Sequence, residues 1–256
     1  QTSVPLNVGT NTVSIAATDF SGNSNTATNR FQVVVAGGAQ KTLTYDLNGN
    51  CTNDGVRTYV WDAANRLVKI TQGSDVIEFV YDGLSRRVAE KLNGTIIKRW
   101  VWVGTEIAEE RDATGTNVTK RFFAQGFQQG GNNFFYTRDH LGSIREVTDN
   151  TGAIVSRYDW DPWGRRTLVS GTDLADFGFT GHFVHKPSGL HLALFRAYDA
   201  ELGRFLSRDP IEENGGINLY AYVLNNSLNL VDPTGEGPID WILTDNWNPS
   251  VEELGA

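Results

Sequence analysis

A short unit that joins an aromatic residue, an aspartate and a turn recurs along the first half of this 256-residue chain. Its aromatic residues are Tyr45, Trp61 and Tyr81, which lie 16 and 20 residues apart, and Trp102 follows 21 residues later in a weaker unit. The units read TYDLNGN (44–50), VWDAANRL (60–67), VYDGLSRRV (80–88) and, more weakly, VWVGTEI. Self-similarity at a period near 20 indicates a repeat architecture, in which each unit buries its apolar face only against its neighbours.

Each unit predicts a strand that ends on the aromatic residue, followed by a turn that the aspartate side chain caps. Arg-Leu or Arg-Val then begins the next strand. Many of the 27 glycines fall in Asn-Gly, Asp-Gly, Thr-Gly or Gly-Gly pairs between short apolar runs, and the chain also contains 13 Phe, 7 Trp and 8 Tyr residues. This composition is typical of an all-β protein with many hairpins, so the fold class that we predict is all-β.

The repeat aromatic residues have a structural interpretation and a functional one. Because aromatic side chains are favoured in strands, we expect Tyr45, Trp61 and Tyr81 to form the repeat core, mostly buried on one inner or inter-strand face. A solvent-exposed row of these three rings would instead favour the binding of glycans.

Charge and composition exclude several classes of protein. The formal net charge of −8 argues against a nucleic-acid partner, which needs a basic face. No apolar run approaches the roughly 20 residues of a membrane span, and no secretory signal is visible among the first residues. Cys51 is the single cysteine, which excludes an intrachain disulfide, and no glycine-rich phosphate loop is present. We therefore expect no cofactor, and a fold that is stabilised by packing.

Residues 1–36 read as the C-terminal strands of a separate domain. The alternating runs Val13–Ala17 and Phe31–Val35 flank a turn at residues 19–23, which is a hairpin pattern. The phrase GTNTVSIAATDFSGN resembles the last strands of the bacterial immunoglobulin-like domains of extracellular proteins. Such a sandwich needs about seven strands and roughly 100 residues, so we expect the chain to begin partway through a domain. Residues 37–40 are then a linker.

Residues 198–235 contain two Asp-Pro pairs, at Asp209 and Asp232. Such pairs favour turns, because proline fixes φ and the aspartate bonds nearby N–H groups. Between them, INLYAYVL (217–224) alternates as a strand does, before an Asn-Asn turn. With the motifs GRF, NLY and NN at these spacings, the stretch closely resembles the C-terminal end of the RHS (rearrangement hotspot) repeat-associated core domain.

The resemblance covers about residues 41–236. The units with an aromatic residue and an aspartate are similar to the YD (tyrosine-aspartate) repeats of the same family, and YTRDHLGSIREVTDNTGAIVSRYDWDPWGRR (136–166) matches the pattern that precedes its core. The resemblance implies hairpins wound as a spiralling β-shell over 41–170, an RHS core domain over 171–236 that closes it, and a short tail, 237–256. We expect strands at Ile144–Thr148, Ile154–Trp160 and Arg166–Ser170, and a short helical turn near 174–177 or 250–254.

In the toxin-complex members of this family, the core domain cuts its own backbone just after the second DPxG motif and frees a C-terminal polypeptide. Carried over by resemblance, the motif aspartates are Asp209 and Asp232, and the arginine of the R-x-Y-D segment is Arg196. Two carboxylates held close cannot both ionise easily, so one keeps a proton while the other acts as a base towards water. The arginine would orient one carboxylate through a bidentate contact.

The cleavage site implied by the resemblance is Gly235, Glu236 and Gly237. Toxin-releasing members usually have leucine after DPxG, whereas Glu236 places a third carboxylate there, which disfavours an oxyanion nearby. The alternative is that both aspartates cap turns and that Arg196 forms a structural salt bridge. The 20 residues from Gly237 to Ala256 are too few for a folded toxin, since independent domains rarely fall below about 40 residues.

Other candidate residues have weaker patterns. His182, His185 and His191 lie within ten residues of each other, yet no cysteine or carboxylate cluster accompanies them. We therefore expect satisfied turn or surface histidines and no metal site. Ser170, Ser188 and Ser207 lack a G-x-S-x-G context, which gives a hydrolase triad no sequence support. Nothing in its surroundings marks Cys51 as a low-pKa thiol.

Two function classes follow from these patterns. In the first, the chain closes the β-shell of a large secreted or cell-surface RHS protein, with or without one aspartic self-cleavage that frees its own C-terminal segment or cargo. In the second, it is a structural or adhesive extracellular module that binds cell-surface glycans or proteins and is not cleaved. A general metabolic enzyme fits neither the composition nor the motifs.

Overall fold

The computed structural model describes residues 9–18, 24–35 and 42–240, and it divides into two units, Gln1–Thr42 and Leu43–Ala256. The first unit contains the strands β1 (Gly9–Thr18) and β2 (Ser24–Val35), which pair in antiparallel fashion. Both alternating runs predicted at this end are therefore strands. The predicted turn at 19–23 and the predicted linker at 37–40 lie outside the described residues.

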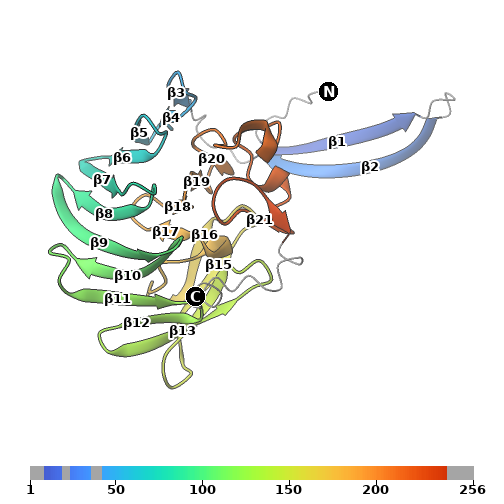
Figure 1. The fold of residues 1–256 in the computed structure, drawn as a ribbon. Helices are drawn as coiled ribbons and strands as arrows, with labels where there is room; N and C mark the ends of the chain where they lie inside the picture. The colour runs from blue at the N-terminus through green and yellow to red at the C-terminus, as the bar shows by residue number, and fades with distance from the viewer. Residues whose placement is uncertain (1–8, 19–23, 36–41, 241–256) are drawn as a thin grey trace, which may run out of the picture. The chain divides into compact units, whose positions relative to one another are not determined.

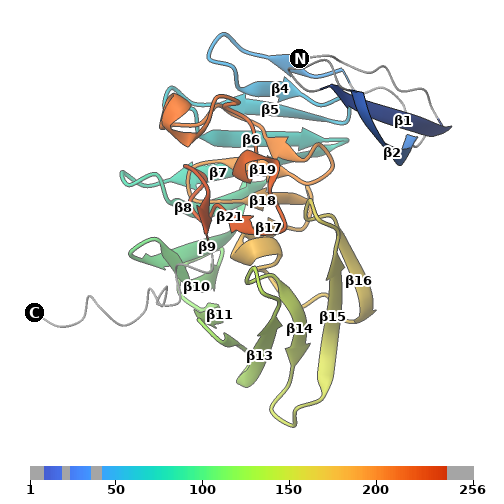
Figure 2. The ribbon, with the colours of Figure 1, turned by 90° about the vertical axis from the view of Figure 1, so that its right-hand side faces the viewer.

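The second unit is built on an antiparallel sheet of 14 strands that follow each other in chain order, so the sheet is a continuous ribbon of hairpins. Figure 1 and Figure 2 show the strands stacked in this order, with β14, β15 and β16 turned aside at the end of the stack. This arrangement confirms the all-β prediction. The strands are β3 (Thr44–Tyr45), β4 (Cys51–Asn53), β5 (Arg57–Trp61), β6 (Leu67–Gln72), β7 (Asp75–Tyr81), β8 (Arg87–Leu92), β9 (Thr95–Val103), β10 (Glu106–Asp112), β11 (Val118–Phe123), β12 (Gly126–Gln129), β13 (Asn132–Arg138), β14 (Ile144–Thr148), β15 (Ile154–Trp160) and β16 (Arg166–Gly171).

An aspartate caps the turn of each of the three clear repeat units, as predicted. At Asp62, Oδ1 accepts the N–H groups of Ala64 (2.9 Å) and Arg66 (3.0 Å), and Asn65 between them has a left-handed φ of 57°. Arg66 also donates from Nε to Oδ2 of the same aspartate (2.7 Å). The N–H groups two and four positions later bond Oδ1 in the same way in the turns that begin at Asp46, Asp82, Asp139, Asp149 and Asp161.

Two of the three repeat aromatic residues pack against the core, and the third does not. Trp61 and Tyr81 are partly buried. Each donates a hydrogen bond to a backbone carbonyl of the preceding strand, Trp61 Nε1 to Cys51 O (2.7 Å) and Tyr81 OH to Leu67 O (2.9 Å). Tyr45 is 39% exposed, so the expectation that it is mostly buried is wrong. It belongs to β3, and among the described residues no strand precedes β3 in this sheet to cover the ring.

Residues 172–240 form small strands and 3₁₀ turns in place of long hairpins. A four-stranded antiparallel sheet, β17 to β20, is followed by the pair β21 and β22. The helical turn lies at 179–181 instead of the predicted 174–177, and the predicted turn at 250–254 lies outside the described residues. The elements are η1 (Phe179–Gly181), β17 (Phe183–His185), β18 (Leu190–Leu192), β19 (Ala197–Asp199), β20 (Arg204–Phe205), η2 (Glu212–Gly215), η3 (Val223–Asn225), β21 (Leu230–Val231) and β22 (Ile239–Asp240).

The prediction of a strand at INLYAYVL is wrong. Residues 217–224 form turns, one isolated bridge between Ala221 and Arg204, and the start of η3, where Val223 has a left-handed φ of 43°. Tyr222 is fully buried, and its ring centroid lies 4.6 Å from that of Tyr198. The backbone coils so that this ring lies in the core. The alternating residues of this stretch therefore belong to an irregular loop and not to a strand.

The segment from residue 172 onward, here called the core segment, packs against one face of the long sheet. Figure 2 shows β17, β18, β19 and β21 lying across the stacked strands. Backbone bonds join the two layers, from Cys51 N to Leu206 O (2.7 Å) and from Ile144 N to Gly178 O (3.2 Å). The hairpins therefore wind around an interior that the core segment fills. One hydrophobic cluster combines Tyr59, Ile70, Phe79 and Trp100 of the sheet with Phe183, Leu190, Leu192 and Leu206 of the core segment.

Candidate functional site

Arg196 brings the two motif aspartates together. One of its terminal nitrogens, Nη2, lies 2.8 Å from Oδ2 of Asp209 and 3.0 Å from Oδ2 of Asp232. All three residues are buried, with exposed fractions of 3% for Arg196, 6% for Asp209 and 1% for Asp232. The arginine directly precedes β19, Asp209 follows β20, and Asp232 directly follows β21. The three residues that the resemblance singled out therefore converge on one guanidinium nitrogen.

The same cluster contacts the backbone of the expected cleavage segment. Arg196 donates from Nε to the carbonyl of Gly235, and Oδ1 of Asp232 accepts the N–H groups of Gly235 (2.8 Å) and Glu236 (3.0 Å). The peptide between Gly235 and Glu236 is thus held at its carbonyl oxygen and at its nitrogen. Glu236 and Gly237 are partly exposed, so solvent contacts the chain directly after the held peptide.

The two carboxyl groups have unequal surroundings. Burial raises the pKa of Asp209, and the charge of Asp232 adds to this, against the lowering effects of the Ile211 N–H group and of Arg196. Burial also lowers the pKa of Arg196, although both carboxylates oppose that shift. Asp232 accepts two N–H bonds on Oδ1 and one from the guanidinium on Oδ2. A pair of this kind suits one protonated and one ionised partner.

Two glycines allow these groups to approach each other. Gly235 has a left-handed φ of 82°, and a Cβ atom there would lie 3.1 Å from Cβ of Arg196. A Cβ atom at Gly215, in η2, would collide with Oδ2 of Asp209. Glycine therefore lets the backbone pass directly against the arginine and the aspartate.

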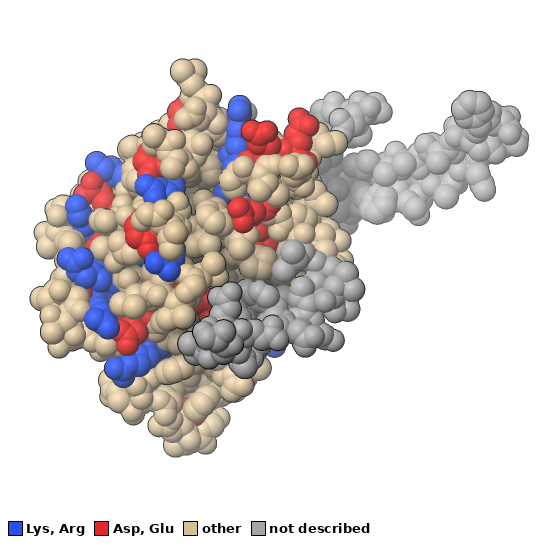
Figure 3. All heavy atoms as spheres, in the orientation of Figure 1, with Lys and Arg blue, Asp and Glu red and all other residues tan. Residues whose placement is uncertain are grey.

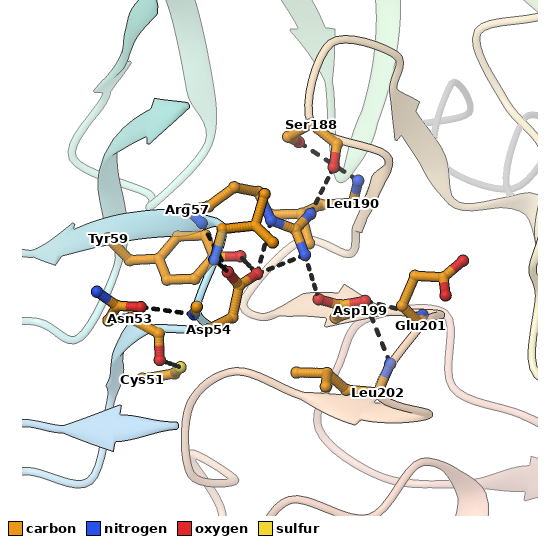
Figure 4. Close-up of polar contacts among 12 residues, drawn as sticks. Cys51, Asn53, Asp54, Arg57, Tyr59, Ser188, Leu190, Asp199, Glu201 and Leu202 are labelled. Atoms are coloured by element: carbon orange, nitrogen blue, oxygen red, sulfur yellow. Dashed lines mark hydrogen bonds and ion pairs between the residues drawn. The ribbon is translucent and has the colours of Figure 1, made fainter. Parts of the chain in front are cut away.

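A second buried arginine also lies between two aspartates. Figure 4 shows Arg57, at the start of β5, with Nε bonded to Asp54 (2.7 Å), Nη2 to Asp199 of β19 (2.5 Å) and Nη1 to the carbonyl of Ser188 (2.5 Å). Burial acts to raise the pKa of Asp54, but bonds from Arg57 N–H and Tyr59 OH outweigh it and lower the pKa. Sequence reasoning missed this cluster, because 142 residues separate the arginine from Asp199.

The Arg57 cluster differs from the Arg196 cluster in one respect that bears on chemistry. Arg57 bonds the carbonyl of Ser188, while its aspartates accept N–H groups of other peptides, at residues 56 and 57 and at residues 201 and 202. No single peptide is held at both ends there. The Arg57 cluster therefore joins the sheet to the core segment, whereas the Arg196 cluster is hydrogen-bonded to both ends of one peptide bond.

The three histidines are buried, so the expectation of turn or surface positions is wrong in part. Each has a hydrogen-bond partner, as expected. His182 Nε2 bonds Asp232 O (2.7 Å), His185 Nδ1 bonds Ser188 Oγ (2.7 Å) and His191 Nε2 bonds Gly164 O (3.0 Å). Within residues 42–240 and the two described strands of the first unit, no group of three His, Cys, Asp or Glu side chains could hold a metal ion.

His185 also contacts Glu90 of β8 through Nε2 (3.3 Å), so that Ser188, His185 and Glu90 form one buried chain of polar contacts. No pattern in the sequence indicated these contacts, since Glu90 lies 95 residues from the histidine. It joins the sheet to the core segment, as the Arg57 cluster does.

The outer surface carries charges of both signs. Figure 3 shows Lys and Arg side chains interspersed with Asp and Glu over the face that it presents. Charged side chains pair across neighbouring strands, as Lys69 and Glu78 do at 3.6 Å and Arg121 and Glu109 do at 3.3 Å. No helix in the described part of the chain is long and apolar enough to cross a membrane.

Comparison with known proteins gives matches over most of the chain. A model of the family described as Teneurin YD-shell matches residues 23–228. The tRNA nuclease WapA of Bacillus subtilis is 31% identical over 213 residues, which cover 76% of this chain and 9% of that protein. The double-stranded DNA deaminase toxin A of Burkholderia cenocepacia is 28% identical over 217 residues, which cover 69% of this chain and 15% of that protein. The chain thus spans a small part of the length of these relatives.

Solved structures of toxin complexes have the same fold. The Tc holotoxin pore of Photorhabdus luminescens superposes with a TM-score of 0.61 at 16% identity, over 88% of this chain and 13% of that one. The crystal structure of TcdB2-TccC3 gives a TM-score of 0.59 at 19% identity, over 75% of this chain and 11% of that one. The observed ribbon of hairpins and its aspartate turns agree with the match to the YD-shell family. The chain belongs to the Teneurin YD-shell family of RHS/YD-repeat proteins.

Proposed function

We propose that this chain closes the β-shell of a large secreted or cell-surface RHS protein, and that it cuts its own backbone once beside Glu236. The observation that carries the proposal is a pair of hydrogen bonds to one peptide: Arg196 donates to the carbonyl oxygen of Gly235, and Asp232 accepts from the N–H group of Glu236. A carbonyl that already accepts a bond from a buried guanidinium is polarised for attack, because the developing negative charge meets a donor in place.

The reaction in this proposal is a hydrolysis. Water loses a proton to Asp232 as its oxygen attacks the carbonyl carbon, and Arg196 stabilises the oxyanion. The carbon–nitrogen bond then breaks, and the leaving nitrogen gains the proton of Asp209, whose pKa burial raises. The products are a carboxylate at the end of the shell and a new amino terminus on the C-terminal segment. Because the protein is its own substrate, each molecule reacts once.

The relatives support a role in toxin delivery. Their names include a tRNA nuclease and a double-stranded DNA deaminase toxin, and the structural neighbours are Tc toxin components. Within the proposal, the partner of the core segment is its own C-terminal segment or a cargo attached to it. Membership of a family of shells and toxin components also favours a secreted or cell-surface location.

The proposed domain organisation follows the same assignment. Residues 1–36 end an immunoglobulin-like domain, 37–40 are a linker, 41–170 are YD repeats, 171–236 are the RHS core, and 237–256 are the tail. The β1–β2 hairpin and the division of the chain at Thr42 support the first boundary. Limited proteolysis that first cuts between residues 36 and 42 is the expected result, and a first cut inside the YD repeats would contradict the boundary.

The adhesive alternative depends on an exposed row of repeat aromatic rings. Trp61 and Tyr81 are partly buried and hydrogen-bonded to strand carbonyls, which leaves Tyr45 as the one exposed ring of the three. A glycan that stacks along the row would have one ring to contact, so the observations favour the shell-closing function.

Intact mass spectrometry of the purified chain tests the proposal. After prolonged incubation at about pH 5 to 7, wild type should give two fragments that meet at Glu236. Asp209→Asn keeps the shape of the side chain, so it should remain full length. Asp199→Asn is the matched control, because it changes a buried aspartate of the Arg57 cluster and should cleave as wild type does. A full-length wild type would overturn the cleavage, and so would cleavage in Asp209→Asn.

A further inference from the structure

His182 is hydrogen-bonded to the backbone of one of the two motif aspartates, and the cleavage described above does not use it. Its Nε2 atom lies 2.7 Å from the carbonyl oxygen of Asp232, although 50 residues separate the two in the chain. The histidine is 3% exposed and the aspartate 1%, so the bond is shielded from water. His182 follows η1 and Asp232 follows β21, so the bond ties the early part of the core segment to the turn that contains the expected cut.

The hydrogen positions in this contact follow from its partners. A carbonyl oxygen only accepts, so Nε2 of His182 carries the hydrogen, and Nδ1 is an acceptor in the neutral ring. Burial lowers the pKa of His182, although the carbonyl and the charge of Asp232 oppose the shift. The positive charges of Arg87 and Arg196 lower this pKa further. The ring is therefore neutral near pH 7 and donates from Nε2 alone.

Two hydroxyl groups continue the chain of polar contacts from the other side of the ring. Thr180 Oγ1 lies 3.4 Å from Nδ1 of His182 and 2.9 Å from the hydroxyl oxygen of Tyr222. Because Nδ1 accepts, the threonine donates to it and accepts from the tyrosine. All three residues are buried. This order of donors and acceptors fixes the orientation of the imidazole ring towards Asp232.

The backbone of Thr180 is strained at this point. Its φ of 48° is left-handed, which a β-branched residue rarely adopts. Its N–H group bonds Oγ of Ser143, a fully buried residue directly before β14 (3.0 Å). Strain of this kind persists only where the surrounding structure imposes it, and it is concentrated at functional sites. In this conformation the threonine hydroxyl lies between His182 and Tyr222.

We propose that His182 is a positioning residue of the self-cleavage, an inference that rests on the function proposed above. It fixes the backbone of Asp232, whose Oδ1 accepts the N–H groups of Gly235 (2.8 Å) and Glu236 (3.0 Å) at the expected cut. A displacement of about 1 Å in such a group can slow a reaction about 100-fold. The imidazole bonds the aspartate backbone and not the reacting peptide, so it acts through Asp232.

His191 gives a matched control for the loss of a buried histidine. It is 2% exposed and belongs to the same core segment, and its Nε2 also bonds a backbone carbonyl, that of Gly164 (3.0 Å). That carbonyl is not part of the Arg196 cluster. Phenylalanine keeps an aromatic ring and removes the donor, so His182→Phe and His191→Phe should destabilise the fold to a similar extent. The first of the two variants alone removes a contact of Asp232.

The rate of cleavage, followed by intact mass spectrometry of the full chain, is the first readout. We expect His182→Phe to cleave about 100-fold more slowly than wild type, and His191→Phe to cleave at the wild-type rate. His182→Gln should restore most of the rate, because its amide group can donate to the Asp232 carbonyl but cannot exchange a proton near neutral pH. This rescue separates positioning from acid–base catalysis. Urea denaturation checks that stability falls alike in the two phenylalanine variants.

Amide hydrogen exchange gives a second readout that does not need cleavage. In the Asp209→Asn background, the N–H groups of Gly235 and Glu236 should exchange roughly 5- to 10-fold faster once His182→Phe is added, as expected when a hydrogen bond is lost. Adding His191→Phe should leave both rates unchanged. If wild type stays intact while His182→Phe speeds this exchange, the proposed cleavage fails and the positioning of the aspartate stands.

Two results would overturn the inference. Equal cleavage rates in His182→Phe and His191→Phe, or equal exchange where no cleavage occurs, would mean that both histidines only stabilise the fold. A His182→Gln variant as slow as His182→Phe would mean that the bond to the Asp232 carbonyl does not carry the effect.

Discussion

The aromatic residues at the strand ends combine two roles in one side chain. Trp61, Trp102 and Trp160 each donate Nε1–H to a backbone carbonyl 10 to 16 residues earlier, over 2.6 to 2.9 Å, while their rings pack against the core. The polar end of the ring thus satisfies a carbonyl, and the rest of it excludes water. The sequence predicted the packing of such rings but not these bonds, since the partner depends on strand register.

Replacing Trp61 tests both roles. Trp61→Ala is expected to lower the free energy of unfolding by about 2–4 kcal/mol, because it removes a partly buried ring and a hydrogen bond. Trp61→Phe should lose about 1 kcal/mol, for the bond alone. Urea denaturation measures both, and Val60→Ala, at an exposed position beside it, should change stability by less than about 0.5 kcal/mol. Equal losses for Trp61→Ala and Val60→Ala would contradict this account.

Gly215 controls the position of Asp209. Gly215→Ala should push the carboxyl away from Arg196, because a Cβ atom there collides with Oδ2, and the rate of cleavage should fall by about 100-fold if the shift approaches 1 Å. The rate at which fragments appear by mass spectrometry measures the effect. Gly83→Ala, in a repeat turn with open space around it, is the control and should cleave at the wild-type rate. An unchanged rate in Gly215→Ala would show that Asp209 is not required at its observed position.

At the scale of elements, local rules predicted the regular parts of the chain and failed in the core segment. The predicted strands at 144–148 and 154–160 match β14 and β15, because an aspartate turn with its own hydrogen bonds separates them. INLYAYVL follows the same alternation without being a strand, because packing of Tyr222 against distant rings decides its backbone. Alternation is a reliable signal only where turn residues define the hairpin.

The aspartate turns predict opposite effects for two substitutions at equivalent positions. Ser85 has a left-handed φ of 62°, where several other turns have glycine, so Ser85→Gly should stabilise the protein by about 0.5–1 kcal/mol. Gly152 has a φ of 82° and open space around it, so Gly152→Ala should destabilise by about 1 kcal/mol through the backbone alone. Thermal denaturation measures both. A destabilised Ser85→Gly would mean that the serine side chain contributes more than the backbone strain costs.

At the scale of the whole molecule, the core segment is joined to the sheet by contacts that no local pattern could predict. Tyr220 OH bonds the carbonyl of Gly49 across 171 residues, and Arg57 bonds Asp199 across 142. The Arg196 cluster could be predicted because the family resemblance supplied its residues.

Buried histidines make the stability of the whole molecule depend on pH. Burial lowers the pKa of His191 to about 3 and also lowers the pKa of His182. An unfolded histidine has a pKa of about 6.5. The stability that the two neutral, buried imidazoles provide is therefore fully present above that pH. Below it, the free energy of unfolding falls by up to about 1.4 kcal/mol per pH unit for each histidine. The raised pKa of Asp209 acts in the opposite direction.

The urea midpoint should therefore fall between pH 7 and pH 5, and His191→Gln should reduce the fall. Equal midpoints at the two pH values would contradict the burial of neutral imidazoles.

The most direct test of the central claim, that the Arg196 cluster hydrolyses the peptide beside residue 236, is the intact mass of Glu236→Leu after incubation in ¹⁸O-labelled water. Removing the anionic side chain next to the developing oxyanion should make this variant cleave faster than wild type. One ¹⁸O atom should enter the new carboxylate of the shell fragment, and Asp209→Asn in the same background should stay intact. If Glu236→Leu remains full length, the core segment is a closed structural cap, and the two aspartates only fix the turns that contain them.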